Sequence, residues 1–141
     1  MTYTLLIDGP SGSGKTTLAN QIGAALGIQV VHLDDFYPGW GGLAEGARMV
    51  ADDVLDPVAP GFWRWDWERN QGAEWVPLVP GADLVVEGVG AVTEASISKA
   101  KARGDVDTLR VVADTETRKA RALKRDPGYA PWWDMWACLL Y

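Results

Sequence analysis

The sequence predicts an α/β fold with three layers, in which helices cover both faces of a parallel sheet of about four strands. Two observations lead to this fold class. Short apolar segments alternate with segments of helical periodicity along the 141 residues, which is typical of parallel strands joined by right-handed crossovers. A glycine-rich segment also follows the first apolar segment directly. Because ligands of such sheets bind beyond the carboxyl ends of the strands, functional residues are expected there.

The first strand is predicted from Tyr3 to Asp8, and a glycine-rich loop follows it. Residues 9–16 read GPSGSGKT and fit the pattern G-x-x-x-x-G-K-[S/T]. Glycines let backbone N–H groups turn towards phosphate oxygens, the lysine reaches the β- and γ-phosphates, and the threonine hydroxyl ligates Mg²⁺. A strand before the loop and a helix after it argue against a chance match. The loop predicts a P-loop NTPase that binds ATP and Mg²⁺ through Gly9, Ser11, Gly12, Ser13, Gly14, Lys15, Thr16 and Thr17.

A helix is predicted from Lys15 to Gly27, and a second strand from Ile28 to Leu33. Asp34 and Asp35 follow this strand directly. A carboxylate at this point would face the γ-phosphate, where it accepts a proton from an acceptor hydroxyl or holds Mg²⁺ through water. The alternative role is to cap the following turn, and we assign that role to Asp35 rather than Asp34.

A helix and an insert precede the third strand. Apolar residues recur at helical spacing at Leu43, Ala47, Val50 and Val54. Residues 57–80 are rich in proline, glycine and tryptophan, and we predict an insert on the acceptor side. The third strand runs from Leu84 to Val86 and ends at Glu87. A carboxylate that ends an apolar strand beside the phosphate loop favours a role in organising Mg²⁺ over that of a solvated terminus.

The last part of the chain contains a helix rich in arginine. A helix is predicted at 93–103, a strand at 108–113, the arginine helix at 116–125 and a terminal helix at 131–140, all within a single domain of residues 1–141. Arg118, Arg121 and Arg125 lie on one helical face, and guanidinium groups suit phosphate oxygens. A solvated basic face is the alternative. We predict that residues 114–130 form a lid whose arginines are catalytic, Arg121 above all.

Eight tryptophans are present, and three of them alternate. In an extended segment, Trp63, Trp65 and Trp67 would lie on one side. They form either a stacking wall for an aromatic acceptor or part of the core, and both interpretations stay open. In the first case the acceptor is bound with the help of Trp40, Arg64, Asp66 and Arg69. Trp132, Trp133 and Trp136 are expected to pack the terminal helix against the sheet or against a second subunit of a homodimer.

The phosphate loop, the segment Asp34-Asp35-Phe36-Tyr37, Glu87-Gly88 and the arginine helix together resemble the uridine kinase branch of the P-loop kinases. More closely, they resemble the short uridine-kinase-like ATP-binding proteins of actinobacteria and their phages. The resemblance covers about residues 3–136. It implies a nucleoside- or nucleotide-kinase-like variant of the P-loop NTPase fold. It also implies that Asp34 is the base on the acceptor hydroxyl, that Tyr37 borders the acceptor, and that Glu87 belongs to a magnesium site with Thr16 and Asp34.

Two departures from the uridine kinases stand out. Those enzymes carry a Tyr-Asp-Phe segment followed by His and Arg for the nucleoside, whereas this chain has WDWER at residues 65–69 without a histidine. Related proteins also continue past the lid to a fifth strand, so the sheet is expected to be reduced at the C-terminus. The single histidine, His32, is expected to be a hydrogen-bonded strand residue rather than a metal ligand.

The expected function is ATP- and Mg²⁺-dependent transfer of phosphate to a small acceptor, a nucleoside or a nucleotide. The alternatives are a regulatory protein that binds a nucleotide without catalysis, and a nucleoside monophosphate kinase in which Arg64 and Arg69 hold the acceptor phosphate. The net charge of -6 argues against nucleic acid as a partner. No apolar run reaches the length of a membrane span, and one cysteine forms no internal disulfide. A cytoplasmic location is therefore predicted.

Overall fold

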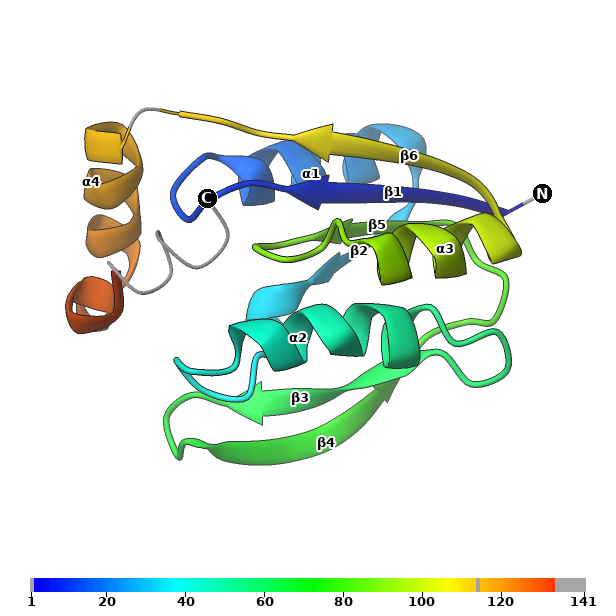
Figure 1. Cartoon of the computed structure of the whole chain (residues 1–141), viewed down its shortest axis with the longest axis horizontal. Coiled ribbons are helices and arrows are strands. Elements are labelled where there is room, and N and C mark those ends of the chain that lie inside the picture. Colours follow the sequence, from blue (N-terminus) through cyan, green and yellow to red (C-terminus); the bar gives the residue numbers. More distant parts are fainter. Residues whose placement is uncertain (1, 114, 134–141) are drawn as a thin grey trace.

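The computed structural model describes residues 2–113 and 115–133, and a four-stranded parallel sheet forms its centre (Figure 1). The strands lie in the order β2 (Gln29–His32), β5 (Leu84–Glu87), β1 (Thr2–Asp8) and β6 (Gly104–Arg110). All three pairings are parallel. The predicted sheet of about four parallel strands is confirmed. Its register pairs both Ile7 and His32 with Glu87, so the carboxyl ends of β1, β5 and β2 meet at one edge.

Helices cover both faces of the sheet, because the strands are apolar on both faces. On one face, Leu5, Ile7 and Val85 pack against Ala19 of α1 (Lys15–Leu26). On the other face, alternate residues such as Leu6 and Val86 belong to the larger core beneath α2 (Leu43–Met49) and α3 (Glu94–Arg103). A π-helical turn, Val50–Val54, continues α2. The three-layer α/β fold is thereby confirmed.

The remaining helical segments lie at the carboxyl edge of the sheet. A 3-10 turn, Leu33–Asp35, follows β2 directly. Helix α4 (Thr115–Arg125) and the 3-10 helix Pro127–Trp132 stand beyond the ends of β1 and β6 (Figure 1). The first residue of the predicted lid, Asp114, and most of the predicted helix 131–140 lie outside the described residues. Among the described residues, no helix is both long and apolar enough to cross a membrane.

Residues 57–80 contain a hairpin that the sequence analysis treated only as an insert. Strands β3 (Gly61–Asp66) and β4 (Gln71–Pro77) pair antiparallel and form a separate two-stranded sheet. Phe62 anchors the hairpin in the core, where its ring centroid lies 5.1 Å from that of Phe36. The alternation of the tryptophans suggested an extended segment but not its partner strand, and the pairing is irregular between Trp63 and Trp65.

The irregular pairing also separates the three alternating tryptophans. Trp63 is 56% exposed and packs on Trp75 within the hairpin. Trp67 lies beyond the end of β3 and packs on Trp40. Of the two alternatives for these rings, the one in which they close the core does not hold for Trp63 and Trp67, both of which are exposed.

The strand predicted at 108–113 was placed too late in the chain. Strand β6 begins at Gly104, immediately after α3. A Cβ atom at Gly104 would lie 2.2 Å from the carbonyl oxygen of Thr2, so glycine lets the chain turn from helix to strand without a loop. Most of β6 is exposed at the edge of the sheet. Its side chains therefore lack the apolar pattern that identifies the inner strands.

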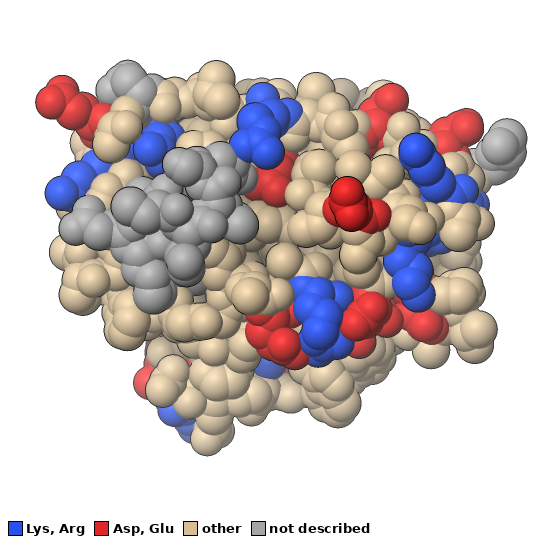
Figure 2. All heavy atoms as spheres, viewed as in Figure 1, with Lys and Arg blue, Asp and Glu red and all other residues tan. Residues whose placement is uncertain are grey.

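Charged side chains of both signs are interspersed on the face of the molecule shown in Figure 2. One cluster consists of Arg48 between Glu45 and Asp52 on α2 and its π-turn. On this face, Lys and Arg do not gather into the single basic stripe that a nucleic-acid-binding surface carries.

Candidate active site

The phosphate loop connects β1 to α1 and depends on glycine at defined positions. Gly12 and Gly14 have φ angles of +76° and +94°, which other residues rarely adopt. A Cβ atom at Gly12 would also lie 2.0 Å from the carbonyl oxygen of Arg118, because α4 packs directly on the loop. Gly14 caps α1 without a side-chain hydrogen bond. The first N–H groups of α1 are therefore left for an anion.

Lys15 lies inside the loop as a buried cation. Its side chain is 8% exposed, and Nζ lies 3.4 Å from the carbonyl oxygen of Pro10. Burial lowers the pKa of Lys15, while the carboxylates of Glu87 and Asp34 oppose that shift. A buried cation with one long hydrogen bond to a carbonyl group is well placed to receive an anionic ligand.

A cavity of about 230 Å³ opens beside Lys15, and we call it the loop cavity. Its lining residues come from the phosphate loop, α1 and α4: Gly12, Gly14, Lys15, Thr16, Thr17, Arg121 and Arg125. Three predicted nucleotide-binding residues lie outside this lining. A Cβ atom at Gly9 would meet the carbonyl oxygen of Val111 at 2.3 Å. Ser13 is buried, and Ser11 bonds to Tyr129.

Thr16, which lines the loop cavity, is hydrogen-bonded to Glu87. The Thr16 hydroxyl donates a hydrogen bond of 2.8 Å to Glu87 Oε2. Glu87 is 1% exposed, and its Oε1 lies 3.3 Å from His32 Nδ1. The carboxylate of Glu87 raises the pKa of His32. A hydroxyl and a carboxylate oxygen side by side are the donors that Mg²⁺ takes from a protein when phosphates and water complete its shell.

Among residues 2–113 and 115–133 there is no cluster of three or more His, Cys, Asp and Glu that could hold a metal. An all-protein metal cage is therefore not present in this part of the chain. The Thr16–Glu87 pair fits the other mode of binding, in which one or two side chains share Mg²⁺ with a nucleotide. His32 lies in β2, the strand in which the sequence predicted it, and it contacts Glu87 of this pair.

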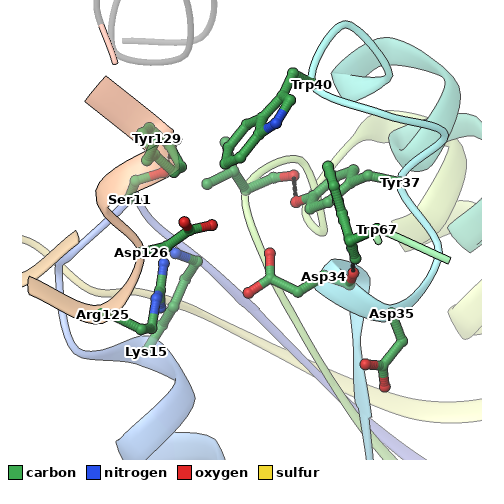
Figure 3. A pocket seen from close by; sticks show the side chains of 11 residues that line it. Ser11, Lys15, Asp34, Asp35, Tyr37, Trp40, Trp67, Arg125, Asp126 and Tyr129 are labelled. Carbon is green, nitrogen blue, oxygen red and sulfur yellow. Dashed lines mark hydrogen bonds between the residues drawn. The ribbon is translucent and has the colours of Figure 1, made fainter. Parts of the chain in front are cut away.

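A second cavity of about 380 Å³ lies on the other side of Lys15, and we call it the aspartate cavity (Figure 3). The 3-10 turn after β2 brings Asp34 and Asp35 to its wall. The side chain of Asp34 is exposed to solvent and lines the cavity. Burial raises the pKa of Asp34, against the opposing effect of Arg125 and Lys15.

Aromatic side chains form further parts of the wall of the aspartate cavity, with Tyr37 and Trp67 beside Asp34 and with Tyr129 across from them (Figure 3). Tyr37 is buried and donates its hydroxyl hydrogen bond to the carbonyl oxygen of Val89. Trp40 packs on Trp67 and on Tyr129, with ring centroids 5.1 and 4.9 Å away. Trp67 donates from Nε1 to the backbone carbonyl oxygen of Asp34 at 2.8 Å. This hydrogen bond fixes the aromatic wall relative to the carboxylate turn.

The three predicted lid arginines all face the phosphate loop, but they have different surroundings. Arg118 is buried: its Nη1 lies 3.4 Å from the carbonyl oxygen of Ser11, and its guanidinium stands 5.3 Å from the ring centroid of Trp133. Arg121 donates to the carbonyl oxygen of Gly12 at 3.4 Å and lines the loop cavity. Arg125 lines both cavities.

The polar residues that the sequence analysis assigned to acceptor binding lie away from the aspartate cavity. Arg64 forms an ion pair of 2.7 Å with Glu74 across the hairpin. Asp66 accepts hydrogen bonds from the backbone N–H groups of Glu68 and Arg69 and closes the hairpin turn. Arg64 and Asp66 line a neighbouring hollow with Asp35, whereas Tyr37 and Trp40 do line the aspartate cavity.

Sequence reasoning did not identify Asp8 as part of the site. This buried carboxylate accepts hydrogen bonds from the backbone N–H groups of Gly9, Gly90 and Val92 at 2.7, 3.2 and 2.9 Å. It thereby joins the start of the phosphate loop to the segment after β5. The sequence did contain a signal for Asp8, a carboxylate at the end of an apolar strand, and the same signal identified Glu87. Tyr129 and Asp126 were also missed, and both line the aspartate cavity.

Comparison with known proteins gives the same fold. No family model matches the chain. It is 33% identical to a protein of Schizosaccharomyces pombe named a probable gluconokinase, over 70 residues that make up 50% of this chain and 32% of that protein. The chain thus spans about a third of the length of this curated relative.

Two solved structures resemble most of the chain. One, described as a possible uridine kinase from Bacillus stearothermophilus, has a TM-score of 0.57 at 20% identity and matches 94% of this chain and 83% of its own. The other, a sugar kinase from a Janibacter species, has a TM-score of 0.57 at 18% identity and matches 100% of this chain and 80% of its own. The chain thus resembles the uridine-kinase-like proteins in fold, and its fold is that of the P-loop kinases.

Proposed function

We propose that this protein transfers the γ-phosphate of ATP to a hydroxyl group of a small-molecule acceptor, with Mg²⁺ as cofactor. The observation that carries this proposal is that Lys15 and Arg125 line both the loop cavity and the aspartate cavity. Two cations at the junction of two cavities are suited to a phosphoryl group that passes from one to the other. The fold of the P-loop kinases supports the same reaction.

Each part of the site has a role in this reaction. The phosphate loop and Lys15 hold the phosphates in the loop cavity, and Thr16 with Glu87 holds Mg²⁺, which supplies charge neutralisation at the phosphates. Asp34 accepts the proton of the acceptor hydroxyl. Its raised pKa makes it a better base than an aspartate of ordinary pKa, because proton transfer is most efficient when the pKa of the base is near the working pH.

The lid contributes positive charge at the junction. Arg125 reaches the transferring group from the acceptor side and Arg121 from the nucleotide side. Arg118 holds α4 on the phosphate loop through its contacts with Ser11 and Trp133, so we assign it a positioning role. Preorganised charges of this kind supply most of the acceleration in phosphoryl transfer.

The composition of the aspartate cavity favours an uncharged acceptor. Three carboxylates, Asp34, Asp35 and Asp126, line it together with Lys15 and Arg125. When ATP is bound, the two cations face its phosphates, and the carboxylates then repel an anionic acceptor. Arg64 is held by Glu74 outside the cavity, so the structure offers little support for the alternative of a nucleoside monophosphate kinase.

The proposal is tested by measuring ADP release from MgATP with a panel of neutral sugars, polyols, nucleosides and nucleotides. Asp34→Asn is expected to lower kcat/KM at least 100-fold with ATP binding retained, an effect within the range of general-base catalysis. Asp35→Asn is the matched comparison and should cost much less. Lys15→Ala should abolish both nucleotide binding and turnover.

The second candidate function is a regulatory protein that binds a nucleotide without transferring phosphate. It is supported if ATP binds, Lys15→Ala abolishes that binding, and no acceptor stimulates ADP release. The match to the curated relative covers 50% of this chain and is compatible with such a role. A kinase that uses ATP and Mg²⁺ would work in the cytoplasm, and this location forms part of the proposal.

A further inference from the structure

A third hollow, of about 500 Å³, adjoins the aspartate cavity, and we call it the tryptophan groove. Four indole rings line it, those of Trp40, Trp65, Trp67 and Trp132, together with Asn70 and Pro38. Trp40 and Trp67 also line the aspartate cavity, so the two hollows adjoin each other at these rings. We propose that the groove binds an uncharged saccharide ring, the distal part of an acceptor whose reacting hydroxyl lies at Asp34. This inference rests on the proposed function.

The geometry of the rings determines how a ligand lies in the groove. Trp40 and Trp132 are parallel within 5°, with their centroids 6.3 Å apart. A flat ring inserted between them would need van der Waals contact of about 3.5 Å on each side, which is more than this separation. The groove therefore offers exposed ring faces rather than a slot. A ligand ring lies on one indole face, and its outer edge stays in contact with water.

The polar groups of the groove are neutral. None of its lining residues carries a charged side chain. Asn70 contributes an amide, and the buried Trp65 Nε1 has no hydrogen-bond partner among the described residues. Both side chains lie around Gly39: a Cβ atom there would be 3.6 Å from Asn70 Oδ1 and 3.8 Å from Trp65 Cζ2. An indole N–H and an amide suit hydroxyl and ring oxygens.

A saccharide ring combines the properties that these observations require. It has no charge, so the carboxylates of the aspartate cavity do not repel it. It presents an apolar C–H face to an indole ring and a rim of hydroxyl groups to the amide and to water. A nucleobase fits less well, since its recognition needs several donors and acceptors along one edge, and Asn70 is the one amide side chain among the lining residues of the groove.

The test compares one-ring and two-ring neutral sugars as acceptors: glucose against maltose, cellobiose and lactose. Trp132→Ala should raise KM for the preferred disaccharide about fivefold to tenfold, the usual effect of losing one ring contact. The kcat for the disaccharide and the KM for glucose should stay unchanged, because the groove contributes binding away from the reacting atoms. Trp63→Ala is the matched control: this ring is exposed on the hairpin, lies outside the groove and packs on Trp75.

A second variant and a second measurement keep this inference separate from the proposed reaction. Asn70→Gly removes the amide and retains the positive φ of 53° at that position, and it should raise the same KM about threefold, the effect of one neutral hydrogen bond. Binding of the disaccharide, followed by tryptophan fluorescence, should persist in Lys15→Ala, which abolishes turnover.

The outcomes distinguish the two proposals. Disaccharide binding that depends on Trp132, without turnover of any acceptor, would support the groove and overturn the kinase. Turnover in which Trp132→Ala and Trp63→Ala behave alike for every sugar would overturn the groove and leave the kinase in place. A KM effect of Trp132→Ala on nucleosides and on no saccharide would overturn the assignment of a saccharide ring.

Discussion

The nucleotide side and the acceptor side of this site are built in different ways. On the nucleotide side, one short segment from Gly12 to Thr17 supplies most of the lining of the loop cavity, and backbone geometry dictates its glycines. On the acceptor side, the walls come from the turn after β2, the hairpin, the segment after β5 and the lid. The first region is a local motif that a sequence displays directly. The second exists only through contacts between segments far apart in the chain.

The largest effect is expected from Gly12→Ala, which disturbs the local motif itself. The added methyl group would meet the carbonyl oxygen of Arg118 at 2.0 Å, at a residue whose φ is +76°. Either the loop or α4 must move, so ATP affinity should fall about 100-fold or more, equal to about 2.7 kcal/mol. Isothermal titration with MgATP measures it. Gly72→Ala is the control, since its Cβ would meet nothing within 4 Å, and an equal loss in both variants would contradict the argument.

Glu87→Gln should have the next largest effect, on the requirement for Mg²⁺. The glutamine keeps the size of the side chain and can still accept the hydrogen bond from Thr16, but it removes the charge. The Mg²⁺ concentration for half-maximal activity should rise about tenfold or more, as is typical when a group beside a metal is changed. Glu74→Gln, on the exposed hairpin, is the control. An unchanged Mg²⁺ dependence would remove Glu87 from the metal site.

Asp34→Asn should increase the stability of the protein at neutral pH while it abolishes turnover. Burial raises the pKa of Asp34 above its ordinary value of 3.8, so the folded protein holds its proton to higher pH than the unfolded chain does. Ionisation therefore lowers the free energy of unfolding as pH rises from about 4 through the raised pKa. The melting temperature of the variant should exceed that of the parent slightly at pH 7, because solvent reaches Asp34 and weakens the effect, and the difference should vanish below pH 4. A variant that is less stable at pH 7 would show that Arg125 and Lys15 outweigh the burial.

Arg64→Ala should have the smallest effect, because it tests the part of the acceptor side that the structure places outside the cavity. The ion pair of Arg64 with Glu74 is exposed, and such pairs contribute about 0.2–1 kcal/mol. The KM for the acceptor should change less than twofold in steady-state assays. A large increase confined to phosphorylated acceptors would instead restore the interpretation of Arg64 as a phosphate ligand.

Five of the eight residues that the sequence predicted to bind the nucleotide line the loop cavity, for physical reasons. A glycine motif, a lysine and a following helix form one local unit, and carboxylates at the ends of apolar strands marked Asp34 and Glu87. Long-range packing determined the rest. The sequence analysis did not predict that β3 and β4 pair as a hairpin, and their pairing is irregular beside Trp63. The start of β6 was missed because its edge position removes the apolar pattern.

The same difference between a local motif and long-range packing explains where the predicted acceptor-binding side chains lie. Tyr37 and Trp40 line the aspartate cavity as expected from their place after β2. Arg64 and Asp66 do not, because Glu74 and the hairpin turn engage them. The ion-pair partner of a charged residue in a hairpin lies on the opposite strand. The sequence analysis had not predicted that strand, so it could not predict the partner of Arg64. Asp126 caps the 3-10 helix after α4 and Tyr129 lies within it, and no local pattern indicates the position of this helix.

The contacts between α4 and the phosphate loop connect ligand binding to the order of the helix. Arg118 and Arg121 direct their hydrogen bonds to backbone carbonyl oxygens at 3.4 Å, and these are long bonds to neutral acceptors. Phosphate oxygens beside them would offer shorter, charge-assisted bonds. If contacts with α4 increase the affinity of the protein for the nucleotide, the bound nucleotide stabilises α4 to the same extent, because such coupling is reciprocal. The amide protons of residues 115–125 should therefore exchange with solvent more slowly when a nucleotide is bound, which makes this helix a reporter of occupancy even when no acceptor is present.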